Sequence, residues 1–350
     1  MENTDPKPQR RVRYKGTHPK AFQEKYKELQ PEQYAADIEK VIQKGRTPAG
    51  MHLSICVNEI IEFLQIKPGQ TGLDATFGYG GHSKEILKLL APGGLLYAID
   101  VDPIELPKTT ERMAAMGFGP DVLVAKKMNF SDIDQVTEEE EIFNFVLADL
   151  GLSSMQIDNP ERGFSLKAEG PLDLRLNPKS GKPASAILPK LSREELQEIL
   201  WFNSDEPYAE FIAEAITSKF EKGGKIETTT QLQELIAEAL DFLPKKERKE
   251  LIKKSCQRCF QAIRIYINDE FGVLDKFLEK LPYTLAPGGR VAILTFHSGE
   301  DRRVKKAFQN MHRAGVYKEI AREPIRPSGA EIFNNPRAKS AKLRWAIKSV

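Results

Sequence analysis

Apolar residues in the first half of the chain form short continuous runs that are separated by helix-like stretches. Residues 95–99, 123–125 and 142–150 are such runs. Runs of this kind are typical of strands buried on both faces of a parallel sheet. The stretch 83–90 instead repeats its apolar residues every three or four positions. This alternation predicts a doubly wound α/β sheet.

The pattern changes after residue 150. Residues 151–183 read as a loop, whereas residues 191–220 and 228–262 have helical periodicity and begin with capping residues. A helical pattern at 270–281 and a strand pattern at 291–296 then resume the α/β alternation. We therefore expect an N-terminal basic and helical extension (1–50), an α/β domain in two segments (51–157 and 263–350) and an inserted all-helical domain (158–262).

The composition of the 350 residues, 40% hydrophobic and 29% charged, fits a soluble globular protein. No apolar stretch is long enough for a membrane helix, so we expect no membrane partner and a cytoplasmic location. The three cysteines are too few for a disulfide framework. Cys256 and Cys259 form a lone C-x-x-C, which we interpret as helix packing, with a zinc site or a redox pair as alternatives. We expect no metal.

The net charge of +2 is unevenly distributed along the sequence. Residues 301–350 contain 13 Lys and Arg against 4 Asp and Glu, and residues 1–20 contain 6 against 2. The remaining residues are therefore acidic overall. Such asymmetry indicates a face that meets a polyanion, although two solvated basic ends explain it equally well.

A glycine-rich turn, Gly78-Tyr79-Gly80-Gly81, lies between a short strand pattern and a helical pattern. This layout places backbone N–H groups and a helix N-terminus against a nucleotide-like ligand. The second strand pattern ends in Asp100, which suits the hydroxyls of a ribose. Ser83 stands where a dinucleotide fingerprint has its third glycine, which favours S-adenosylmethionine over a pyrophosphate cofactor. Glycine for packing alone is the alternative.

Asp149 ends the fourth strand pattern, at the sheet edge where ligands bind in open α/β folds. Capping of a following helix is its alternative role. His297 lies in a polar segment after the last strand pattern, and without a partner we do not assign it a catalytic role. His82 is better placed to orient the glycine turn than to move protons.

Seven motifs in order resemble the MraW/RsmH family over about residues 50–348. They lie at 74–83, 149–156, 162–165, 170–175, 260–268, 296–302 and 335–341. The resemblance implies a Rossmann-like class I methyltransferase sheet with an inserted helical substrate domain. It also implies S-adenosylmethionine-dependent methylation of the exocyclic N4 of a cytidine in the decoding centre of small-subunit (16S) rRNA. The partner is then this rRNA or the 30S subunit, and the protein a monomer or homodimer.

The resemblance assigns the site residues as well. The cofactor contacts are Gly80, Gly81, His82, Asp100, Phe130, Asp149 and Gln156. Asp149 is also the predicted catalytic residue. The predicted RNA contacts are Arg162, Arg175, Arg264, His297, Arg302 and Arg337. A non-catalytic ribosome-assembly factor that binds cofactor and RNA, and a nicotinamide-dependent oxidoreductase, are the competing functions.

Overall fold

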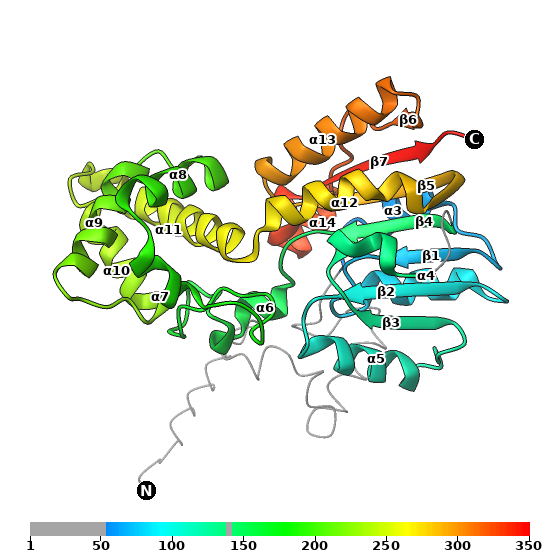
Figure 1. Cartoon of the computed structure of the whole chain (residues 1–350), viewed down its shortest axis with the longest axis horizontal. Helices are drawn as coiled ribbons and strands as arrows, with labels where there is room; N and C mark the ends of the chain where they lie inside the picture. Colours follow the sequence, from blue (N-terminus) through cyan, green and yellow to red (C-terminus); the bar gives the residue numbers. More distant parts are fainter. Residues whose placement is uncertain (1–53, 138–141) are drawn as a thin grey trace, which may run out of the picture. The chain divides into compact units, whose positions relative to one another are not determined.

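The computed structural model describes residues 54–137 and 142–350, and Figure 1 shows their arrangement. The expectations for residues 1–50 lie outside these residues. A seven-stranded sheet has the order β3-β2-β1-β4-β5-β7-β6. The strands are β1 (Thr71–Asp74), β2 (Leu95–Asp100), β3 (Leu123–Lys127), β4 (Phe143–Asp149), β5 (Leu285–Thr295), β6 (Tyr317–Ile320) and β7 (Lys342–Lys348). The expected doubly wound, Rossmann-like α/β sheet is confirmed.

Strands β1 to β5 pair in parallel, and β7 pairs antiparallel with both β5 and β6. Asp74 at the end of β1 is in register with Ala98 on one side and Leu147 on the other. The strand order reverses between β1 and β4, so the crevice at their carboxyl ends is the switch point where such sheets bind ligands. Asp74, Asp100 and Asp149 all come to this edge.

Successive side chains of β4 enter two separate hydrophobic cores, as its continuous apolar run predicts. Phe145 and Leu147 pack on one face, against helices α3, α4 and α5, whereas Val146 and Ala148 pack on the other face, against α12 and α13. These helices are α3 (Val57–Leu64), α4 (Gly81–Leu90), α5 (Glu105–Ala115), α12 (Glu270–Thr284) and α13 (Ser298–Arg313). Burial on both faces therefore fixes the positions of the strand ends.

A third hydrophobic core belongs to the segment between β4 and α12, whose helices form a group apart from the sheet in Figure 1. They are α6 (Ser154–Asp158), α7 (Ala184–Ile187), α8 (Arg193–Ser204), α9 (Ala209–Glu221), α10 (Thr229–Ala239) and α11 (Lys245–Asn268). Capping boxes start α8 and α10, as the sequence predicts: Ser192 with Glu195, and Thr228 with Gln231.

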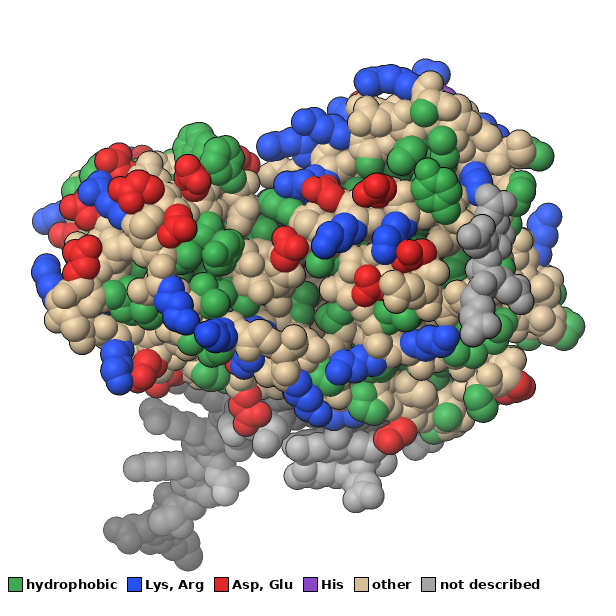
Figure 2. Space-filling model, viewed as in Figure 1, with side chains coloured by type: hydrophobic (Ala, Val, Ile, Leu, Met, Phe, Trp, Pro, Cys, Tyr) green, Lys and Arg blue, Asp and Glu red, His purple; other side chains and the backbone are tan. Residues whose placement is uncertain are grey.

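Helix α11 is one continuous helix of 24 residues, and the expected domain boundary at 262/263 falls inside it. Its residues Cys256 and Cys259 are buried in the core of the helical insert, which supports the packing interpretation. Burial raises the pKa of Cys256 to about 11. The insert also leaves aromatic side chains such as Trp201 and Phe242 exposed, and Figure 2 shows hydrophobic side chains on its surface.

Several local expectations differ from the structure. The sequence predicts a helix after Asp102 with Pro103 at its first position. Helix α5 instead starts at Glu105, because Oδ1 of Asp102 accepts the N–H groups of Ile104 and Glu105 in a preceding turn. The region expected to be loop also contains α6 and a 3₁₀ turn, η3 (Pro160–Arg162). No strand was predicted at β6, which has four residues, or at β7, which is rich in Lys. The remaining elements are η2 (Phe130–Gln135), η4 (Leu188–Lys190), α14 (Gly329–Asn334) and η5 (Pro336–Ser340).

Among the described residues, every helix is too short or too polar to cross a lipid bilayer.

Candidate cofactor and substrate site

A cavity of about 1050 Å³ opens at the carboxyl edge of β1, β2 and β4. Its lining combines the glycine turn, the segment after β4, one face of α11 and the start of α13. It includes all seven predicted cofactor contacts: Gly80, Gly81, His82, Asp100, Phe130, Asp149 and Gln156. Three predicted RNA contacts line it too: Arg264, His297 and Arg337. The structure thus gathers residues from distant motifs around one space, while their contacts with ligands stay predictions.

The glycine turn both packs closely against helix α5 and leaves room for a ligand in the cavity. Gly80 has φ 72° and precedes α4, and a Cβ placed on it would lie 2.2 Å from Cε of Met113 on α5. The positive φ favours glycine here, and the close approach of Met113 adds to that preference. Ser83, in place of a third glycine, donates its hydroxyl proton to Oδ2 of Asp74 at 2.5 Å. The helix N-terminus is tied to the end of β1 by this bond.

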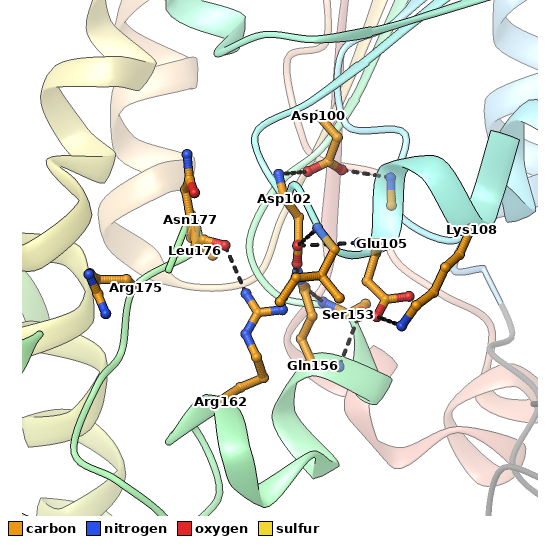
Figure 3. Close-up of polar contacts among 12 residues, drawn as sticks. Asp100, Asp102, Glu105, Lys108, Ser153, Gln156, Arg162, Arg175, Leu176 and Asn177 are labelled. Atoms are coloured by element: carbon orange, nitrogen blue, oxygen red, sulfur yellow. Dashed lines mark hydrogen bonds and ion pairs between the residues drawn. The ribbon is translucent and has the colours of Figure 1, made fainter. Parts of the chain in front are cut away.

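Asp100 is held by two backbone N–H groups. Gly78 donates to its Oδ2 at 2.7 Å, and Asp102 donates to its Oδ1 at 2.8 Å (Figure 3). Burial raises the pKa of Asp100 in spite of these bonds. Each carboxylate oxygen keeps a second lone pair, so the fixed carboxylate can still accept hydroxyl protons from a bound ribose.

Asp149 has a carboxyl oxygen without a partner. Its Oδ1 is buried and accepts no hydrogen bond from the described residues, while its backbone N–H donates to the Thr76 hydroxyl at 2.6 Å. Burial, with the nearby charges of Asp74 and Glu300, raises the pKa of Asp149 to about 8. Asp149 is not a helix cap, since Ser153 caps α6. An unsatisfied buried carboxyl in a cavity is typical of a functional group.

A charged cluster lies beside Asp149 at the start of α13. Arg264 donates two bonds to Glu270, at 2.7 and 3.0 Å, and Nε2 of His297 lies 3.1 Å from Oε1 of Glu300. Burial raises the pKa of Glu300, but His297, the Phe296 N–H and Arg264 outweigh it and hold that pKa below its usual value. Glu270, His297 and Glu300 are close enough for a metal site. The Arg264 guanidinium supplies the positive charge that this cluster needs.

The other predicted cofactor residues are held by internal bonds. Nε2 of His82 lies 3.1 Å from the carbonyl oxygen of Ile55. Phe130 packs edge-on against Phe277, with 5.1 Å between ring centroids. Gln156 closes the capping box of α6 and donates from Nε2 to Oδ2 of Asp102 at 2.9 Å. Each side chain is therefore fixed where it borders the cavity.

Arg162, Arg175 and Arg302 lie outside the cavity lining. Arg162 is 8% exposed and pairs with Asp102 at 2.7 Å, while Arg175 binds Asp173 within its own loop. Arg302 is 61% exposed, with Asp205 3.9 Å away. The buried Arg162 guanidinium therefore has a structural role, because both of its partners are protein groups. Its contact with RNA stays a prediction. At the cavity edge, Arg337 pairs with Asp158 at 2.7 Å.

Asp102 is the site residue that sequence reasoning missed. Its carboxylate accepts bonds from Gln156 and Arg162, both from segments that follow β4, and Figure 3 shows the three converging. The sequence signal was its position two residues after Asp100, which was interpreted only as the start of a helix. Asn268 ends the motif at 260–268 but was given no role. Its Nδ2 donates to the carbonyl of Leu174 and its Oδ1 accepts the N–H of Leu176, which ties the end of α11 to the loop.

Comparison with known proteins places the chain in a family. The model of the MraW methylase family matches residues 49–349. The ribosomal RNA small subunit methyltransferase H 1 of Lachnoclostridium phytofermentans is 63% identical over 348 residues, which are 99% of this chain and 95% of the relative. The ribosomal RNA small subunit methyltransferase H 2 of Alkaliphilus metalliredigens is 65% identical over 349 residues, 100% of both chains. The ribosomal RNA small subunit methyltransferase H of Thioalkalivibrio sulfidiphilus is 40% identical over 85% of this chain and 98% of its own. The chain belongs to the MraW methylase family.

Proposed function

We propose that this protein methylates the exocyclic N4 of a cytidine in the decoding centre of small-subunit (16S) rRNA. The observation that carries the proposal is the unpartnered carboxyl oxygen of Asp149, which borders the same cavity as the glycine turn and Asp100. The names of the relatives support small-subunit rRNA as the substrate. The rRNA or the assembled 30S subunit is then the partner, and a cytoplasmic location follows as a prediction.

S-adenosylmethionine is the cofactor, and the residues present fit it. The cavity lining from residues 74–82 and 100–101 contains the carboxylates of Asp74 and Asp100 and, among the described residues, no Lys or Arg. Such a lining suits a cationic sulfonium and repels a pyrophosphate. Asp100 would hold the ribose, and Phe130 would pack on the adenine. When bound, this cofactor supplies an electrophilic methyl group.

The role of Asp149 is to make the acceptor amine more nucleophilic. The N4 lone pair of cytosine is delocalised into the ring, which makes the amine planar and unreactive. The free Oδ1 of Asp149 can accept one N4 proton as a hydrogen bond and draw the nitrogen toward a pyramidal geometry. The nitrogen becomes acidic once it carries the methyl group, so its proton then passes to Asp149 or to water.

The target base must leave its stack to enter the cavity, at a cost of a few kcal/mol. Positive side chains at the cavity edge offset this cost through phosphate contacts. Arg337 lies at that edge, and Arg302, Arg303, Lys305 and Lys306 are on α13. Arg264 and His297, inside the lining, would face the base or its ribose.

The test of the proposal is methyl transfer from tritiated S-adenosylmethionine to small subunits from a strain without this activity. Wild-type protein should label the 16S rRNA, and nucleoside mapping should find N4-methylcytidine. Asp149→Ala should keep the fold and lose most activity. Wild-type turnover of that variant would remove Asp149 from the mechanism.

Two measurements separate the competing functions. Calorimetry should detect binding of S-adenosylhomocysteine and not of NAD, whereas the reverse result would favour an oxidoreductase. A protein that binds both the cofactor and the subunit but transfers no methyl group would be an assembly factor.

A further inference from the structure

Helix α11 presents one face to the cavity at its C-terminal end. The cavity lining takes Gln257, Phe260, Gln261, Arg264 and Asn268 from this helix. At about 100° per residue these five positions fall within an arc of roughly 100° on the helix surface. The opposite side of α11 carries Cys259 and Ala262 into the hydrophobic core of the helical insert. The helix therefore separates the core from the cavity.

The same arc continues outward along the N-terminal half of α11 as lysines. Lys246 and Lys253 project within about 20° of Arg264, and Lys249 lies near the angle of Phe260. All three lysines are exposed, and none forms an ion pair with a described residue. Figure 1 shows α11 reaching from the helical insert toward the sheet. Along one face of α11, exposed lysines in the N-terminal half are thus followed by cavity-lining residues in the C-terminal half.

One acidic residue, Glu250, lies on this arc and reduces its positive charge at that position only. Glu250 lies between Lys246 and Lys253, and its Oε1 is 3.7 Å from Nζ of Lys254. This pair is neutral as a whole. The three unpaired lysines therefore give the outer half of the face its positive charge.

We propose that this face of α11 is a track for single-stranded rRNA next to the target nucleotide. The α11 track consists of Lys246, Lys249, Lys253, Gln257, Gln261 and Arg264. The lysines bind phosphates, and the glutamines and Arg264 bind the nucleotides that enter the cavity. This inference rests on the proposed function, because it takes the cavity as the place of the target base.

The dimensions and chemistry of the track suit an RNA strand. From Lys246 to Arg264 the helix rises about 27 Å at 1.5 Å per residue, enough to follow several nucleotides. Lysine acts as a flexible point charge, which suits contacts with a mobile backbone and carries no sequence preference. Solvated lysines without a partner are the competing explanation, and they predict no effect on substrate binding.

The test replaces the three lysines by glutamine, which keeps the length and the helix propensity of the side chain. For Lys246→Gln/Lys249→Gln/Lys253→Gln, binding to small subunits and to naked 16S rRNA is measured by filter retention between 50 and 200 mM KCl. Each lost phosphate contact lowers the slope of log affinity against log salt by about 0.7. The triple variant should therefore lose about 2 units of slope and bind about 100-fold more weakly at 0.1 M salt.

A matched variant controls for the change in net charge. Lys219→Gln/Lys222→Gln/Lys276→Gln also removes three exposed lysines that are not on α11: Lys219 on α9, Lys222 at its C-cap and Lys276 on α12. It should bind with the wild-type slope. Equal slopes for the two triple variants would overturn the proposal. A loss seen with subunits but not with naked rRNA would also overturn it, because the partner would then be a ribosomal protein.

Two further readouts keep this proposal separate from the proposed function. S-adenosylhomocysteine affinity should match that of the wild type in the track variant, and the loss of rRNA binding should appear as a raised KM for the small subunit. If wild-type protein transfers no methyl group, the proposed function fails, whereas the salt slope still reports whether the track binds RNA.

Discussion

Arg162 and Asp102 form a buried ion pair that joins the cofactor side of the cavity to the helical insert. Nη1 of Arg162 lies 2.7 Å from Oδ2 of Asp102, and the side chains are 8% and 1% exposed. Nη2 of Arg162 donates to the carbonyl of Leu176 at 2.8 Å, and the N–H of Asp102 donates to Asp100 (Figure 3). The strand end that carries Asp100 is therefore connected to the loop that leads into the insert.

We expect Arg162→Gln to lower kcat on the order of 100-fold, because a displacement of about 1 Å in the substrate loop misaligns the acceptor amine. S-adenosylhomocysteine affinity should change less than kcat, since Gly78 still holds Asp100. The free energy of unfolding should fall by about 3–5 kcal/mol, as Asp102 loses its cationic partner. Single-turnover methyl transfer, calorimetry and urea unfolding measure the three effects.

Two variants serve as controls for Arg162→Gln. Arg162→Lys keeps the charge beside Asp102 and should recover part of kcat. Arg193→Gln breaks exposed pairs with Glu210 and Glu214 inside the helical insert, and such pairs contribute only about 0–1 kcal/mol. An Arg162→Gln enzyme with wild-type kcat would show that the ion pair is purely structural.

Burial and capping patterns made much of the fold predictable. The apolar run that became β4 is buried on both faces, and the capping boxes of α8 and α10 have the residues that the sequence indicated. The strands β6 and β7 were missed because the pairing of β7 with β5 and of β6 with β7, rather than their own residue pattern, determines them. Tertiary pairing of this kind leaves little signal in a single sequence.

The segments that form the site were predictable, but the ion pairs and hydrogen bonds between them were not. The glycine turn, Asp100 and Asp149 come to one cavity because parallel strands end at one edge. The partner of Arg162 was not predictable, because Asp102 is 60 residues away and nothing local pairs the two. From the sequence alone, an arginine in a polar loop is interpreted as an RNA contact, because the sequence does not show whether the side chain is buried.

Gly80→Ala should destabilise the protein by about 2–4 kcal/mol, since the new Cβ overlaps Cε of Met113 and the residue has a positive φ. The overlap is with a flexible side chain, so Met113→Ala should suppress part of the cost. A double-mutant cycle by urea unfolding should give a favourable coupling of about 1 kcal/mol. Strict additivity would mean that backbone strain alone explains the effect.

Asp149→Asn should stabilise the protein increasingly as the pH rises. The pKa of Asp149 is about 8 in the folded protein and near 3.8 ordinarily, so between these values the folded state binds a proton that the unfolded state does not. Wild-type stability attributable to this group is fully present below pH 4 and falls by about 1.4 kcal/mol per pH unit up to pH 8. Asparagine does not titrate, so the variant lacks this loss. Urea unfolding at pH 5, 6.5 and 8 measures the difference, and a constant difference across the three would contradict the raised pKa.

Asp74→Asn should shift the acidic limb of the pH–rate profile to lower pH. Asp149 can take up the N4 proton only when it is ionised, so kcat/KM for the cofactor should rise through the pKa near 8 in the wild-type enzyme. The charge of Asp74 contributes to that raised pKa, after burial itself. Asparagine removes the charge, and with its Oδ1 accepting the Thr76 N–H its Nδ2 can donate to the Ser83 hydroxyl oxygen, which keeps α4 attached to β1. The limb should therefore move down while the plateau above pH 9 changes little. An unmoved limb would show that the titrating group in the profile is not Asp149.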